Sequence, residues 1–192
     1  MTDKKLMPWE ALPSVWKTEA AFWSWVKGAI RKSWVRHPIK LEYIKRNRVK
    51  VANPNFGKRK GSKEEVWGCK CEQCEQYFIQ SETEVNHKGA SASLKQLSDI
   101  QACVEKLLVV SFDDLEILCK PCHEVYSYMQ SHNISREEAV LEKKVIEFKK
   151  FKVQDQKEIL TQKLGKSKMA TLTNADKRIE AYRLFLKGEH SD

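Results

Sequence analysis

The chain has 192 residues, of which 41% are hydrophobic and 32% are charged, so it can bury a core while much of its surface stays charged. No apolar run approaches the roughly 18 residues that a membrane-spanning helix needs, and Met1–Trp9 lacks the apolar centre of a secretion signal. These features argue against a transmembrane or secreted protein. We therefore expect a soluble, cytoplasmic protein without a membrane partner.

The net charge of +9 is concentrated in one stretch of the chain. Residues 27–63 contain 13 Lys or Arg and one acid, Glu42, which gives +12 and leaves −3 for the rest. Such a basic block favours a polyanionic partner, and nucleic acid is the first candidate. The alternative is a solvated helix face without a partner.

Residues 1–65 are predicted to form a basic, helical N-terminal region. Thr18 and Glu19 can open a helix that runs to about Val35, because apolar residues recur there at helical spacing: Phe22, Trp25, Val26, Ala29, Ile30 and Trp34. Pro38 is expected to end this helix.

The region continues with residues 39–50, which are expected to be helical or extended. Residues 53–63 are expected to be a flexible cationic linker, because Asn-Pro and two glycines disfavour regular structure there. The candidate nucleic-acid-binding residues of both segments are Lys45, Arg46, Arg48, Lys50, Lys58, Arg59, Lys60 and Lys63. Disorder without function is the alternative for the linker.

Residues 66–131 are predicted to form a compact core, and residues 132–192 a helical C-terminal region. The expected core elements are strands at 77–79 and 83–86, a helix at 94–108, a strand at 115–118 and a helix from Pro121 to about Gln130. In the C-terminal region, Ser135 and Glu138 form a capping-box pair that opens a helix. A segment at 165–173 separates that helix from a last one at 175–187.

Two C-x-x-C pairs organise the core. Cys71 and Cys74 are separated by 44 residues from Cys119 and Cys122, and the four can supply thiolates to one tetrahedral zinc ion. The alternatives are two C-x-x-C turns that do not share a metal ion, or free thiols. Cys69 is a possible substitute for Cys71. Disulfide scaffolds are usually shorter and secreted, so the six cysteines do not indicate one. A thiol at Cys103 is expected to be buried in a helix.

Two histidines accompany the cysteine pairs. His87 would end a strand and His123 follows Cys122 directly, so a shared zinc could bring them near each other. One such histidine can take a proton from water, and a second one can hold a divalent ion against a phosphate. Alternatively, His123 is a zinc ligand and His87 a satisfied core residue.

The order of these motifs resembles the HNH endonuclease family, whose core is the ββα-metal fold with a treble-clef zinc site. Val85-Asn86-His87-Lys88 is similar to the family's V-D-H-I, and residues 115–123, Leu-Glu-Ile-Leu-Cys-Lys-Pro-Cys-His, are similar to its L-Q-L-L-C-K-P-C-H. Residues 22–34 are similar to small HNH proteins carried by bacteriophages. If the chain is phage-encoded, the cytoplasm is that of the host.

The resemblance implies an α+β fold in which a small zinc-stabilised ββα-metal core is flanked by N- and C-terminal helices. His87 falls on the general base, and His123 on a ligand of a catalytic Mg²⁺ or Mn²⁺ ion. Asn86 stands where most members have an aspartate as second ligand, and its uncharged amide should bind Mg²⁺ more weakly. Asp114 stands where many have a loop-fixing asparagine, so it keeps an acceptor but loses the donor.

The expected function is that of a metal-dependent endonuclease that hydrolyses phosphodiester bonds in duplex DNA. One alternative is a catalytically weak, zinc-stabilised DNA-binding accessory protein, for example in phage DNA packaging or recombination. A second is a binder of single strands or RNA that uses tryptophans as stacking platforms.

Overall fold

The computed structural model describes residues 6–89 and 92–188, so residues 1–5 and 189–192 of the two predicted flanking regions lie outside the described residues. The fold is α+β, with many helices and two small antiparallel sheets, as expected. The chain divides into two compact units, 1–123 and 124–192. Of the helices in the described part, none has the length and apolar character to cross a bilayer.

Three helices open the first unit: α1 (Pro8–Ala11), α2 (Glu19–Val35) and α3 (Pro38–Asn47). The Thr18 hydroxyl accepts a hydrogen bond from the Ala21 amide at 3.1 Å and caps α2, which ends at Val35 as expected. Pro38 begins α3 instead of only closing α2, because proline fits the first turn of a helix.

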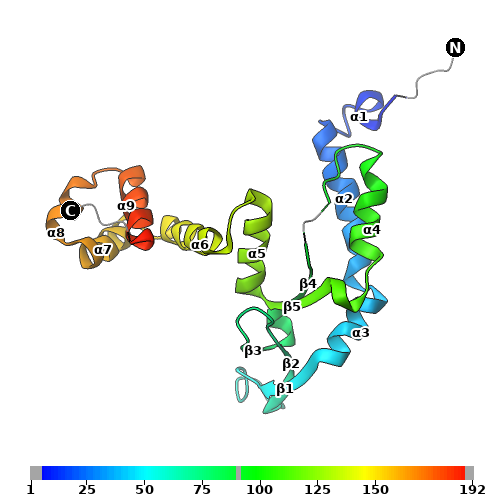
Figure 1. Ribbon diagram of the computed structural model, residues 1–192, viewed down its shortest axis with the longest axis horizontal. Helices are drawn as coiled ribbons and strands as arrows, with labels where there is room; N and C mark the ends of the chain where they lie inside the picture. The colour runs from blue at the N-terminus through cyan, green and yellow to red at the C-terminus, as the bar shows by residue number, and fades with distance from the viewer. Residues whose placement is uncertain (1–5, 90–91, 189–192) are drawn as a thin grey trace. The chain divides into compact units, whose positions relative to one another are not determined.

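Helix α2 packs against α4 (Asp99–Leu108), and the two run side by side in Figure 1. Trp23, Leu94 and Cys103 form the buried centre of this contact. The expected apolar stripe of α2 was wrong at two positions: Trp25 is 61% exposed and Ala29 is exposed, whereas Trp23, outside the stripe, is 4% exposed. Both tryptophans fit a helical period, and only the position of α4 selects the inward one. Cys103 is a buried thiol, as expected.

The first sheet has the order β1-β2-β3, with β1 (Arg48–Ala52), β2 (Glu65–Lys70) and β3 (Tyr77–Ile79) antiparallel. Residues 53–63 therefore connect two paired strands in a hairpin, and the Asn53 amide side chain donates to the Lys63 carbonyl at 2.8 Å. The predicted region boundary at 65/66 falls inside β2. A side chain at Gly68 would lie 2.2 Å from the Phe78 carbonyl oxygen, so the β2–β3 pairing needs glycine there.

The second sheet pairs β4 (Thr83–His87) with β5 (Leu115–Cys119). The short 3₁₀ turns η1 (Gln80–Glu82) and η2 (Phe112–Asp114) precede the two strands, and α5 (Lys120–His132) follows β5 directly. One face of this sheet packs against Trp34, Ile39, Tyr43 and Ile44 from the end of α2 and from α3.

The outer edge of β5 is closed by the backbone and side chain of Glu72 and by Tyr43, and no further strand of the described residues pairs with it. Glu72 accepts from the Ile117 amide at 2.8 Å, and its own amide donates to the Ile117 carbonyl at 2.8 Å. The Tyr43 hydroxyl donates to Glu72 and to the Leu115 carbonyl. Burial raises the pKa of Tyr43 to about 12, so the phenol keeps the proton that these bonds need. These contacts tie α3 to β5 and to the first cysteine turn.

The second unit contains the end of α5 and the helices α6 (Arg136–Lys150), α7 (Val153–Leu164), α8 (Lys166–Thr171) and α9 (Ala175–Lys187). The capping box of Ser135 and Glu138 and the bounds of α9 agree with the sequence predictions. Ala139, Val145, Phe148 and Leu160 form its buried apolar positions, and Phe148 stacks on Tyr182 at 4.1 Å between ring centroids.

The sequence predicted one helix between the Ser135 capping box and the separator at 165–173, whereas the structure has two, because α6 ends at Lys150 and α7 begins at Val153. The buried Gln156 side chain donates to the carbonyls of Phe148 and Phe151, and it accepts from Arg178 Nε at 3.1 Å. These bonds satisfy the carbonyls that the end of α6 leaves free. The segment predicted as a separator contains the short helix α8.

Candidate metal centre and histidine site

The four predicted cysteines come together in the first unit. Cys71 and Cys74 lie in the turn after β2, Cys119 ends β5, and Cys122 lies in the first turn of α5. All four sulfur atoms lie within 4.8 Å of one another, so the group could hold a metal ion such as zinc. The turn that carries the first pair bends back because the Glu75 amide bonds the Cys71 carbonyl and Glu75 has a φ of 59°.

The sulfur chemistry fits a divalent cation. Cys74 Sγ and Cys119 Sγ are 3.9 Å apart, which is far from a disulfide bond but close to the spacing of about 3.8 Å that two sulfurs have around tetrahedral zinc. Burial raises the pKa of Cys71, but hydrogen bonds at the backbone of Cys119, Cys74 and Gln73 bring it to about 7. Burial and the neighbouring sulfurs raise the pKa of Cys122. A bound cation would let all four sulfurs ionise together.

Cys69 does not belong to this group. It is 1% exposed and packs with Val85, Leu115 and Ile117 in the core between α3 and the second sheet. Burial raises the pKa of its thiol. The geometry therefore favours Cys71 over Cys69 as the ligand.

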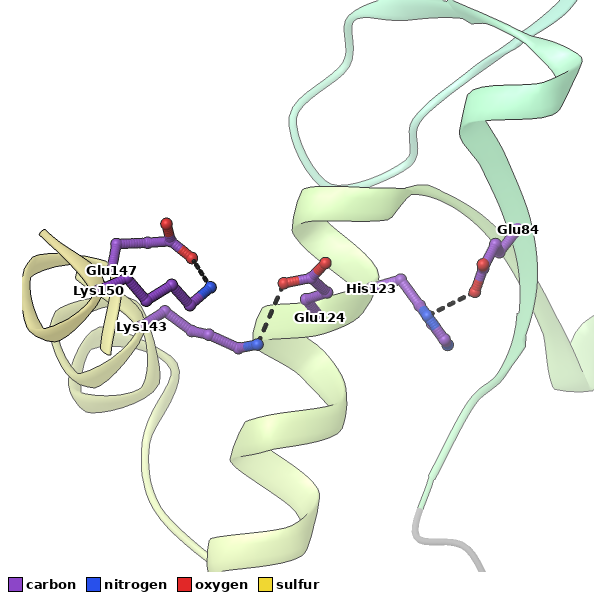
Figure 2. Close-up of polar contacts among 6 residues, drawn as sticks. All are labelled: Glu84, His123, Glu124, Lys143, Glu147 and Lys150. Carbon is purple, nitrogen blue, oxygen red and sulfur yellow. Dashed lines mark hydrogen bonds and ion pairs between the residues drawn. The ribbon is translucent and has the colours of Figure 1, made fainter. Parts of the chain in front are cut away.

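His123 projects from the first turn of α5 toward β4. Its Nδ1 lies 2.7 Å from a carboxylate oxygen of Glu84, and Figure 2 shows the ring directed at that carboxylate. The carboxylate can only accept, so Nδ1 carries the hydrogen, and in a neutral ring Nε2 then keeps a free lone pair. Figure 2 also shows two other ion pairs: Lys143 with Glu124, which joins α6 to α5, and Lys150 with Glu147, which lies within α6.

Asn86 is buried on the same face of β4 as Glu84. Its Nδ2 donates to an oxygen of Glu116 at 2.8 Å, across the β4–β5 register in which these two residues are opposite each other. Both side chains are less than a tenth exposed. Because the Glu116 carboxylate requires a donor, the amide group of Asn86 is fixed with Oδ1 turned away from Glu116.

His87 lies on the opposite face of β4, because side chains alternate along a strand. Its ring contacts Trp34 at 4.2 Å between centroids, and Nε2 lies 3.1 Å from the Leu107 carbonyl oxygen. The carbonyl can only accept, so Nε2 carries the hydrogen and Nδ1 keeps the lone pair. The pKa of His87 is lowered, mainly by burial and also by the charges of His37 and Lys40. The hydrogen bond to the Leu107 carbonyl and the charge of Asp114 act in the opposite direction.

Asp114 fixes the loop in front of β5. Its carboxylate accepts from the Ser111 amide at 2.7 Å and from the Ser111 hydroxyl at 2.8 Å, which lowers its pKa. Its backbone carbonyl accepts from the amide of Lys88, next to His87. Asp114 thus has the acceptor role that the sequence predicts, and it contacts the site through the backbone.

The predicted residues therefore gather around β4 in two groups. Asn86 and His123 lie on the face toward α5, together with Glu84, whereas His87 lies on the face toward Trp34. Sequence reasoning did not assign the partners Glu84, Glu116 and Lys40. Glu84 could have been found from the sequence, because side chains alternate along a strand and residues 84 and 86 therefore lie on the same face.

The eight predicted nucleic-acid-binding residues also fall into two groups. Lys45 and Arg46 on α3 both pair with Glu42. The other six, which we name the hairpin cations, lie on β1 and on the connection to β2: Arg48, Lys50, Lys58, Arg59, Lys60 and Lys63. Arg48 and Lys50 each lie 4.3 Å from the Trp67 ring centroid. Within the described residues, none of the six pairs with a carboxylate.

Comparison with known proteins does not identify a family: no family model, curated protein or solved structure matches this chain. The likeness to HNH endonucleases therefore rests on the motif residues of the sequence alone.

Proposed function

We propose that this protein is a metal-dependent endonuclease that hydrolyses phosphodiester bonds in DNA, and that the four cysteines hold a structural zinc ion. One observation carries the proposal. In each of His87, Asn86 and His123, a protein acceptor fixes one polar atom by a hydrogen bond and leaves the opposite atom of that side chain for another partner. Partners of this kind orient metal ligands and catalytic bases in enzymes.

The atoms left over match the required chemistry. His87 Nδ1 has a lone pair on a ring that burial keeps neutral near pH 7, so it can accept a proton from water. Asn86 Oδ1 and His123 Nε2 are an oxygen and a nitrogen that would hold a Mg²⁺ or Mn²⁺ ion, with the Glu84 carboxylate beside them. Such an ion supplies charge stabilisation at the phosphate and at the leaving oxygen.

The residues of the chain would then act as follows. His87 removes a proton from a water molecule as the water oxygen bonds to phosphorus. The bond between phosphorus and the 3′ oxygen breaks, the leaving 3′ oxygen takes a proton from a solvent water molecule, and His87 later returns its proton to solvent. The products are a 5′-phosphate and a 3′-hydroxyl. In-line attack requires the base and the leaving oxygen on opposite sides of phosphorus. The positions of His87 and His123 on opposite faces of β4 suit that requirement.

The basic test of the function is plasmid cleavage by the wild-type protein in Mg²⁺, in Mn²⁺ and in EDTA. Cleavage that depends on the divalent ion supports the proposal. Tight DNA binding without cleavage in any of these conditions would instead favour the zinc-stabilised binding protein, for which the uncharged Asn86 is the supporting observation.

Replacing Asn86 by aspartate is expected to destabilise the metal-free protein by about 1–3 kcal/mol at pH 7, because a carboxylate would replace the donor that Glu116 needs. Mn²⁺ should restore part of the loss, since a cation between two carboxylates removes their repulsion. Thermal or urea unfolding in EDTA and in Mn²⁺ measures both effects.

The matched control exchanges the two partners, Asn86→Asp with Glu116→Gln, and so keeps one donor and one acceptor in the buried pair. We expect near wild-type stability and cleavage at a lower Mg²⁺ concentration, because residue 86 then offers an anionic oxygen. Wild-type stability of the single variant in EDTA would mean that the contact between residues 86 and 116 does not form.

Neutralising all six hairpin cations with glutamine is expected to weaken DNA binding and its salt dependence. If about half of them contact phosphates, the log–log slope of affinity against salt should become shallower by about 3. The control variant Lys45→Gln/Arg46→Gln should change the slope by less than about 1, because Glu42 already pairs with both residues. Equal slopes for the wild type and the six-site variant would place the DNA on another surface.

A further inference from the structure

Three basic side chains surround the ring of Trp34 at the end of α2. The His87 ring lies at 4.2 Å and the His37 ring at 5.1 Å between centroids, and Lys40 Nζ lies 5.7 Å from the Trp34 ring centroid. We name these four residues the Trp34 cluster. Lys40 is in the first turn of α3, so two helices and β4 fix the cluster.

The Trp34 cluster has an excess of positive charge. Lys40 is partly buried, yet within residues 6–89 and 92–188 it makes no ion pair with a carboxylate. The carboxylate whose charge acts on it is that of Glu84, which already lies 2.7 Å from His123. His37 Nδ1 is buried and has no hydrogen-bond partner in the described part of the chain. A partly desolvated ammonium group without an anion is costly, which favours an anionic ligand from outside.

The position of Lys40 distinguishes it from the hairpin cations. It shares the Trp34 ring with His87, the proposed base, and its ammonium group is close enough to Glu84 for electrostatic attraction. Glu84 in turn contacts His123, the proposed metal ligand. In the described sheet, β4 has a partner strand on one edge only, β5. A phosphate at the other edge would meet His87 and Lys40 on one side and His123 on the other.

We propose that Lys40 is a further catalytic residue, which contacts a non-bridging oxygen of the scissile phosphate beside His87 and stabilises the negative charge that develops there during attack. This inference rests on the proposed nuclease function. The ammonium group of Lys40 already lies over the Trp34 ring before the substrate binds, so little reorganisation is needed.

The test compares Lys40→Met, Lys40→Arg and the control Lys95→Met, an exposed lysine of the same unit. Methionine keeps an apolar stem against Trp34 and removes only the charge. Single-turnover cleavage of a short DNA duplex with saturating protein measures the chemical step. Duplex affinity in EDTA, zinc content and the thermal midpoint are measured for each variant.

We expect Lys40→Met to slow single-turnover cleavage by about 10²–10³-fold, the usual effect of removing one donor to a developing oxyanion. Its duplex affinity should fall by less than about 5-fold, because only one of several phosphate contacts is lost. Lys40→Arg should recover at least a tenth of the wild-type rate, and Lys95→Met should match the wild type. If Lys40 were only a structural residue, its replacement would lower the cleavage rate, the duplex affinity, the zinc content and the thermal midpoint together.

Two results would overturn the inference, and they differ from failure of the proposed function. If Lys40→Met cleaves at the wild-type rate while His87→Ala is inactive, Lys40 has no catalytic role, and the proposed nuclease function is unaffected. Equal loss of rate, zinc and stability in Lys40→Met and Lys40→Arg makes Lys40 a structural residue. If the wild type itself cleaves no DNA with Mg²⁺ or Mn²⁺, the proposed function fails, and the catalytic role of Lys40 fails with it.

Discussion

Replacement of Cys119 by serine is expected to remove the bound metal and to unfold much of the first unit. Cys119 ends β5, and its sulfur lies beside those of a turn that follows β2 and of Cys122 in α5. A metal ion at this point would join two sheets and a helix. Structural zinc binding supplies about 10–16 kcal/mol in small zinc domains, which exceeds the stability of most folds of this size.

Metal analysis by mass spectrometry and circular dichroism of purified Cys119→Ser protein measure the effect. The matched control is Cys69→Ser, which makes the same chemical change at a buried cysteine two residues before Cys71. It should keep one zinc ion per chain and lose about 1–3 kcal/mol, the cost of burying a hydroxyl without a good partner. Full zinc content and normal stability in Cys119→Ser would contradict a shared zinc site, and zinc loss in Cys69→Ser alone would identify Cys69 as the ligand.

Replacement of His87 by alanine is expected to slow DNA cleavage by about 10²–10⁴-fold, the usual effect of removing a general base. DNA affinity and zinc content should stay near their wild-type values, because His87 contacts neither the cysteine group nor the hairpin cations. Alanine also removes the contact with Trp34 and the hydrogen bond to Leu107. His87→Gln is therefore a second variant, which keeps a donor for the Leu107 carbonyl but cannot act as a base.

Two further histidine variants separate the roles. His123→Ala should lose cleavage and also bind Mn²⁺ more weakly, whereas His87→Ala should lose cleavage with Mn²⁺ binding unchanged. His132→Ala is the matched control, because this histidine lies at the end of α5 and stacks on Tyr128, outside the proposed site. If both His87→Ala and His87→Gln cleave at the wild-type rate with the same metal requirement, the mechanism proposed here is wrong.

Much of the local structure followed from the sequence. The turn between the strands at 77–79 and 83–87, the strand before Cys119, and the last helix at 175–187 lie where periodicity and turn residues predicted them. The C-x-x-C spacing likewise predicted the four-cysteine group. The strands, the turn and the helix depend on residues within about four positions of one another, and each cysteine pair lies in one turn, so local pattern is enough to find them. The meeting of the two cysteine pairs across 44 residues was predicted from the four ligands that one zinc ion needs.

Other features were decided only by contacts between distant segments. Residues 53–63 look like a linker, but hydrogen bonds between residues 48–52 and 65–69 make them the end of a hairpin. The C-x-x-C spacing favours Cys71 but leaves Cys69 as a possible substitute, and the packing of Cys69 against Val85 and Ile117 excludes it from the metal group. The helix break after Lys150 depends on the buried Gln156, whose hydrogen bonds no local pattern reveals.

The candidate site shows the same division between sequence and tertiary structure. The motif identified His87, Asn86 and His123 as polar residues of the right kind, because their chemistry is carried by their side chains alone. Which atom of each is free depends on Leu107, Glu116 and Glu84, and two of these partners lie 20 and 30 residues away in the chain from the residues they fix. Only the packing of α2, α3 and α4 around β4 brings a partly buried ammonium group and a carbonyl to the base, because burial and charge proximity are properties of the folded chain.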